Sequence, residues 1–105
     1  MTVGDEGLFQ SILAQFIEET ENDLHQLDEH LKYMNTVPIR EIVHKLAGRI
    51  GQMGAKSLSV KLRTIETKLV DGTSLSSLVE RLMSAKDEVE KLLRTIRVQA
   101  MAQSN

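Results

Sequence analysis

The chain is 105 residues long, with 41% hydrophobic residues, 27% charged residues and a formal net charge of −2. This length suits one domain with a single core, and the composition excludes an intrinsically disordered chain. The chain has no cysteine, which excludes a disulfide framework and a thiolate metal site, and no apolar run approaches the roughly 20 residues of a membrane span. We therefore predict a single monomeric domain over residues 1–105 without membrane insertion, and a reducing cytoplasmic location is favoured.

The charges are unevenly distributed along the chain. Residues 1–35 contain eight acidic residues and one lysine, whereas residues 40–63 contain six basic residues and one glutamate. Such an asymmetry concerns binding partners rather than the fold. Because the total charge is negative and aromatic residues make up only 3%, binding to nucleic acid is not expected.

The first predicted element is a long amphipathic helix over residues 5–34. Its apolar residues recur at helical spacing and are all expected in the core. They are Leu8, Ile12, Leu13, Phe16, Ile17, Leu24, Leu27, Leu31 and Met34. The sequence "NTVP" ends this helix, because Thr36 can cap a following helix and Pro38 suits its first turn. The second helix is predicted over residues 38–53, and its buried stripe consists of Ile39, Ile42, Val43, Leu46, Ile50 and Met53.

Two further helices follow. Gly54 ends the second helix. A third helix is predicted over residues 55–71, because apolar residues again recur at helical spacing there, and the sequence "DG" ends it. Thr73 or Ser74 can cap the last helix, predicted over residues 74–98, and the final "MAQSN" is expected to be a frayed tail. Four amphipathic helices with short connections and no alternating polarity predict an all-α fold, an antiparallel four-helix bundle.

One face of the second helix carries a histidine among very small residues. At about 100° per residue, His44 points away from the apolar stripe, and the residues within about 60° of it include Ala47, Gly48 and Gly51. Each interior glycine costs a helix about 1 kcal/mol relative to alanine, so the pattern indicates a surface left bare for close approach by another macromolecule. An exposed neutral imidazole is a nucleophile, and nearby cations such as Arg40 favour an added phosphoryl dianion. Without a general base, a carboxylate pair or a phosphate-binding loop, the pattern predicts a phosphate carrier rather than a complete catalytic site.

The segment "HKLAGRIGQMGAKSLSVKLRTIE", from His44 to Glu66, resembles the signature of histidine-containing phosphotransfer (HPt) domains of two-component phosphorelays. That signature has a histidine followed by leucine, lysine and glycine, then Gly-Ala ten residues after the histidine, a further leucine and a Leu/Ile-Glu pair. The matching residues are His44, Leu46, Gly48, Gly54, Ala55, Leu58, Ile65 and Glu66. The resemblance implies a four-helix bundle whose His44 accepts a phosphoryl group from a receiver-domain aspartate and passes it to another receiver.

The resemblance also implies partners and a docking surface. The partners would be response-regulator receiver domains and a hybrid sensor kinase, with Mg²⁺ on the receiver and no cofactor or metal held by the carrier itself. Close approach of a receiver would use the small residues Ala47, Gly48, Gly51 and Ala55. As a carrier, the chain would have no kinase activity of its own.

The chain departs from the family pattern at two positions. The usual lysine three residues after the histidine, which helps hold the phosphoryl oxygens, is Ala47, and the usual small residue two positions further on is Arg49. Arg49 projects toward the core boundary, so Arg40 and Lys45 are better candidates for contacts with the phosphoryl group. Gln52 is a further candidate, which would form a hydrogen bond from the flank. A docking module with impaired transfer therefore stays an alternative function.

Other functions are less well supported by the sequence. His25 and His30 are five residues apart, which does not bring them side by side as i, i+4 metal ligands would be. The phosphoacceptor helix pair of a sensor kinase usually has an acidic residue after its histidine and a proline soon afterwards, whereas Lys45 follows His44 and no proline follows at all. A purely structural bundle stays open, and acid-labile phosphate on His44 would distinguish a carrier from it.

Overall fold

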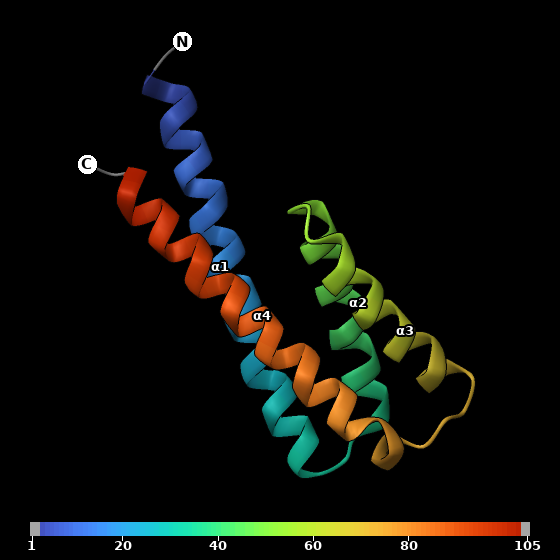
Figure 1. Ribbon diagram of the computed structural model, residues 1–105. Helices are drawn as coiled ribbons and strands as arrows, with labels where there is room; N and C mark the ends of the chain where they lie inside the picture. Colours follow the sequence, from blue (N-terminus) through green and yellow to red (C-terminus); the bar gives the residue numbers. More distant parts are fainter. Residues whose placement is uncertain (1–2, 104–105) are drawn as a thin grey trace.

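The computed structural model describes residues 3–103 and contains four helices. They are α1 (Val3–Lys32), α2 (Thr36–Gln52), α3 (Lys56–Val70) and α4 (Leu75–Gln103). Successive helices run in opposite directions, and the two long helices α1 and α4 lie beside the shorter pair α2 and α3 (Figure 1). No strand occurs among residues 3–103, so the predicted all-α four-helix bundle is confirmed. Within the same residues, no helix combines the length and the apolar character that crossing a bilayer requires.

Apolar side chains from all four helices form one core. Five of the six residues predicted for the buried stripe of α2 are buried, namely Ile39, Ile42, Val43, Leu46 and Ile50. Burying one such aliphatic side chain stabilises the fold by about 1.5–3 kcal/mol. Rotating α2 about its axis would expose this stripe, so the core determines which face of α2 points to solvent.

Four residues predicted to lie in the core are exposed instead. Leu8 and Ile12 are 62% and 51% exposed. The first turns of α1 extend beyond the α2–α3 pair (Figure 1), and Ile12 lines an open depression with residues at the end of α2. Met34 and Met53 are 43% and 37% exposed, because each follows the last residues of a helix. Helical periodicity identifies the apolar face of a helix, but it does not show where the neighbouring helices end.

The largest difference in helix boundaries is at the end of α4. The other boundaries agree with the predicted ones within two residues, whereas α4 continues to Gln103 instead of ending at residue 98. The prediction that "MAQSN" frays is therefore wrong for residues 101–103, which are helical, and the last two residues lie outside the described part of the chain.

The connections between the helices follow the expected turn chemistry with one exception. Gly54 and Gly72 have φ values of +91° and +93°, in the left-handed region that favours glycine, and each follows a helix end as predicted. Ser74 caps α4, since its Oγ accepts a 3.4 Å hydrogen bond from a backbone N–H in the first turn. Thr36 is not a cap, because it is already the first residue of α2 and Asn35 occupies the N-cap position.

Ion pairs join the two long helices. Lys86 Nζ of α4 lies 2.9 Å from Asp28 Oδ1 of α1, and Arg97 pairs with Glu21 nearer the chain ends. The hydrogen bond with Asp28 raises the pKa of Lys86 above its usual value of 10.5, although burial acts in the opposite direction. The α1–α4 pair is thus held by long charged side chains in addition to the core.

Candidate functional site

His44 lies on the face of α2 opposite the buried stripe. Its side chain is 63% exposed, whereas the preceding Val43 is fully buried and Leu46 is 1% exposed. Because these neighbours fix the rotation of α2, the imidazole cannot turn into the core. The exposure of His44 agrees with the orientation predicted from the apolar stripe.

Glu66 of α3 binds one nitrogen of this imidazole. His44 Nδ1 lies 2.7 Å from Glu66 Oε2, and the Glu66 side chain is only 21% exposed. A carboxylate accepts hydrogen bonds but does not donate them, so Nδ1 carries the proton in this contact. In the neutral ring the lone pair then belongs to Nε2. The contact therefore selects the tautomer in which Nε2 is the free nucleophile.

Sequence periodicity does not predict the contact between His44 and Glu66, although Glu66 belongs to the matching motif. The two residues are 22 positions apart on different helices, and their meeting depends on how α3 is rotated against α2. The available signal is the place of Glu66 directly after the buried Ile65, at the edge of an apolar stripe, where a side chain can reach a neighbouring helix.

Two cations share a shallow depression with this pair. The depression has a volume of about 530 Å³, and it is lined by Arg40, Glu41, His44, Lys45 and Glu66. Arg40 and Lys45 therefore lie beside His44, and their contact with a phosphoryl group stays a prediction. The lining also contains two carboxylates, so an anion would be held by the placement of the cations rather than by a net positive charge.

Arg49 and Lys45 both pair with one buried carboxylate of α1. Asp23, whose side chain is 6% exposed, places Oδ2 2.6 Å from Arg49 Nη1 and Oδ1 3.8 Å from Lys45 Nζ. Arg49 Nε also lies 3.7 Å from a carboxylate oxygen of Glu19. A buried carboxylate needs such partners because an unpaired charge in the interior is costly. Arg49 is thus engaged by α1, which agrees with its prediction as a poor phosphate ligand.

The prediction that Ala47 is an accessible docking residue is wrong. Ala47 is fully buried, and its carbonyl oxygen accepts a 2.8 Å hydrogen bond from Ser59 Oγ of α3. Gly51 belongs to the same contact, since a Cβ at this position would lie 3.0 Å from Ser59 Oγ. The position of Ala47 around the helix axis, relative to His44, does not show that α3 covers this edge of α2. The small size of both residues is explained by the close approach of α2 and α3.

Gly48 and Ala55 differ in their surroundings. Gly48 is partly exposed, and a Cβ there would meet nothing within 4 Å, so the surface beside His44 is open at this point. Ala55 occupies the N-cap position of α3 and packs partly against the core. A docking role stays a prediction for both residues.

Gln52 does not lie in the depression that contains His44. It lines a separate depression of about 160 Å³ together with Ile12 of α1 and Met53. The predicted hydrogen bond from Gln52 to a phosphoryl group on His44 therefore has no support in the geometry. The reason is that the Gln52 side chain lies on the edge of α2 that faces α1.

The two histidines of α1 lie apart from this site. His30 Nδ1 is 3.2 Å from Asn35 Nδ2, and His25 lines a depression between α1 and α4. Within residues 3–103, no group of three histidine, cysteine, aspartate or glutamate side chains is placed to hold a metal ion.

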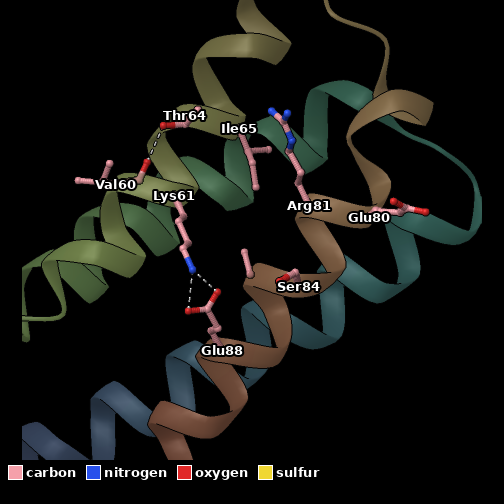
Figure 2. Close-up of a pocket in the computed structure, with 9 residues that line it drawn as sticks. Val60, Lys61, Thr64, Ile65, Glu80, Arg81, Ser84 and Glu88 are labelled. Carbon is pink, nitrogen blue, oxygen red and sulfur yellow. Dashed lines mark hydrogen bonds and ion pairs between the residues drawn. The ribbon is translucent and has the colours of Figure 1, made fainter.

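A further depression, which is apolar, lies between α3 and α4 (Figure 2). Its volume is about 450 Å³, and its apolar lining comes from Val60, Ile65 and Ala85. Lys61 Nζ reaches across it to Glu88 Oε2 at 2.8 Å. This depression shares no lining residue with the one that contains His44, so α3 separates the two.

Comparison with known families identifies the domain to which the chain belongs. The family model described as the Hpt domain matches residues 11–103, which include all of α2, α3 and α4 and most of α1. Searches against curated proteins and against solved structures found no significant match. The chain therefore belongs to the Hpt family, whose domains take part in histidine phosphotransfer in two-component systems with response-regulator receivers as partners.

Proposed function

We propose that the chain is a phosphorelay carrier, which accepts a phosphoryl group on His44 from the aspartate of one receiver domain and passes it to another receiver. The observation that carries this proposal is the exposed imidazole of His44, whose Nδ1 is bonded to Glu66 at 2.7 Å while Nε2 stays free. An exposed nucleophile in a shallow depression suits transfer between two proteins, because the partner must reach the reacting atom. The proposal includes a cytoplasmic location.

The transfer step follows from the protonation state of the ring. The Nε2 lone pair attacks the phosphorus atom of the receiver's aspartyl phosphate, and the bond between phosphorus and the aspartate oxygen breaks. Its electron pair leaves with the aspartate carboxylate. The imidazole ring gains one positive charge, because Nδ1 keeps its proton against Glu66. The Glu66 carboxylate stabilises this charge through an ionic hydrogen bond. The reverse step delivers the phosphoryl group to the second receiver.

Arg40 and Lys45 replace the family lysine in this proposal. Arg40 lies one turn before His44, and both cations line the depression around the imidazole. A guanidinium can contact two phosphoryl oxygens at once. A lysine introduced at Ala47 would not replace them, because its side chain would have to enter the contact between α2 and α3. The Mg²⁺ that neutralises the phosphoryl oxygens would be held by the receiver.

The docking surface in this proposal extends from Gly48 and Ala55 toward α1, whereas Gly51 lies against Ser59 of α3. Ile12 and Met53, both exposed, line a depression together with Arg49 and Gln52 of α2. Exposed apolar side chains that lie together are typical of surfaces that bind other proteins. The sequence placed Ile12 and Met53 in the core, so it did not identify them as docking residues.

A docking module with impaired transfer is the second candidate. It is favoured by one observation, which is that the position of the family lysine is a buried alanine, Ala47. Such a module would bind receivers through the same surface without becoming phosphorylated.

Incubation with a phosphorylated receiver distinguishes these functions. The carrier should acquire acid-labile label, and His44→Gln should abolish the label while changing the free energy of unfolding by no more than about 0.5 kcal/mol. His25→Gln, an exposed histidine of α1, is the matched control and should keep the label. Label that persists in His44→Gln would contradict the assigned acceptor. If the chain without substitutions binds receivers but never becomes labelled, the docking module is favoured.

A further inference from the structure

We propose that Asp23, the buried carboxylate of α1, is a positioning residue that draws Lys45 away from the phosphoryl site and so weakens the retention of a phosphoryl group on His44. This inference rests on the proposed function, since it concerns the phosphorylated state of His44. It assigns a regulatory role to a residue that neither lines the depression nor touches the imidazole.

The two cations that face Asp23 are held very differently. Arg49 Nη1 forms a 2.6 Å hydrogen bond with Oδ2, and the Arg49 side chain is 20% exposed. Lys45 Nζ lies 3.8 Å from Oδ1, beyond hydrogen-bonding distance, and its side chain is 55% exposed. Arg49 therefore satisfies the buried carboxylate, whereas Lys45 is attracted by it but free to move on its flexible stem.

Lys45 has a second possible anionic partner. It directly follows His44 and lines the same depression. A phosphoryl group carries a charge of roughly −1.5 to −2 near pH 7, so it attracts the ammonium group more strongly than a carboxylate that Arg49 already neutralises. When Lys45 turns to the phosphoryl group, it gives up its attraction to Asp23. The gain from the new contact is reduced by that loss.

The consequence is a lower stability of the phosphorylated histidine than the number of nearby cations suggests. With Asp23 present, the equilibrium between phosphorylated carrier and phosphorylated receiver is shifted toward the receiver. A carrier benefits from this shift, because a phosphoryl group that is held too firmly is not passed on.

The test measures the ratio of labelled carrier to labelled receiver at equilibrium. Asp23→Asn keeps the size of the side chain and removes its charge, and it should shift the ratio toward the carrier by about two- to fivefold, as expected for a partly exposed ion pair. Lys45→Gln should shift the ratio toward the receiver. In the Lys45→Gln background, Asp23→Asn should have little effect, a dependence that a merely structural role of Asp23 would not produce.

Glu19→Gln is the matched control. Like Asp23→Asn, it removes a negative charge of α1 that pairs with Arg49. Glu19 does not pair with Lys45, so the ratio of labelled carrier to labelled receiver should stay unchanged. If Asp23→Asn does not fold, Lys45→Gln still tests the inference by itself. Lys45 is exposed, so its substitution should not disturb the fold, and the inference requires Lys45 to contact the phosphoryl group. An unchanged ratio in Lys45→Gln, or an equal effect of Asp23→Asn with and without Lys45, would overturn the inference. Failure of the unchanged chain to acquire label would instead overturn the proposed function, and this inference with it.

Discussion

The two helix pairs of the bundle are joined by different kinds of contact. Between α2 and α3, Gly51 allows a close approach and Ser59 donates a hydrogen bond to the backbone of Ala47. Between α1 and α4, long charged side chains form ion pairs, such as that of Lys86 with Asp28. Backbone contact fixes the distance and rotation of two helices, whereas long ionic side chains adapt to small shifts. The pair that carries the 2.7 Å contact of His44 with Glu66 is the one fixed by backbone contact.

Enlarging Gly51 should break the tight contact and produce the largest effect on stability. A Cβ at this position would lie 3.0 Å from Ser59 Oγ, whose own hydrogen bond holds it in place. Overpacking costs about 1–3 kcal/mol, which exceeds the gain of about 1 kcal/mol in helix propensity. We therefore expect Gly51→Leu to lower the denaturation midpoint. Gly48→Ala is the control, because a Cβ there has free space, and it should raise the midpoint. Equal midpoints in the two variants would exclude helix contact as the reason for Gly51.

Removing the charge of Glu66 tests what the contact between α2 and α3 contributes to phosphoryl transfer by His44. Glu66→Gln leaves a neutral hydrogen bond to Nδ1, which is weaker than the ionic one by about 1 kcal/mol. The rate of phosphoryl transfer should fall roughly three- to tenfold, with an unchanged melting temperature. Glu88→Gln removes a carboxylate that reaches α3 from α4 through Lys61, and it should not change the rate. Similar slowing in both variants would point to a general charge effect rather than to the contact with His44.

The smallest expected effect concerns the ion pair between α1 and α4. Because Asp28 raises the pKa of Lys86 in the folded state, the pair contributes fully below the unfolded lysine pKa, and the contribution is lost as pH rises through the raised pKa. Asp28→Asn should lower the free energy of unfolding at pH 8 by less than about 1 kcal/mol. The difference between the variant and the unchanged chain should shrink above pH 10.5. Chemical denaturation at the two pH values measures it, and a constant difference would contradict this assignment.

The sequence predicts those features that depend on one helix at a time. The apolar stripe of α2 was sufficient to place His44 on the exposed face, because burial of the stripe fixes the opposite face. Ala47 and Leu8 were misplaced because their exposure depends on a second helix. At Ala47, α3 covers an edge that a helical wheel leaves open. Leu8 belongs to the first turns of α1, which extend beyond the α2–α3 pair (Figure 1). The motif marks Glu66, but its partner follows only from the relative rotation of α2 and α3.

In the proposed function, the hydrogen bond between His44 and Glu66 also determines the chemical identity of the phosphorylated product. Imidazole is an ambident nucleophile, and phosphorylation of its two nitrogens gives two different regioisomers. With Nδ1 bonded to Glu66 at 2.7 Å, only the other nitrogen has an available lone pair. The packing of α2 against α3 thus blocks one nitrogen much as a protecting group does in organic synthesis, and in the proposed function a docked receiver would meet a single reactive atom in a constant place.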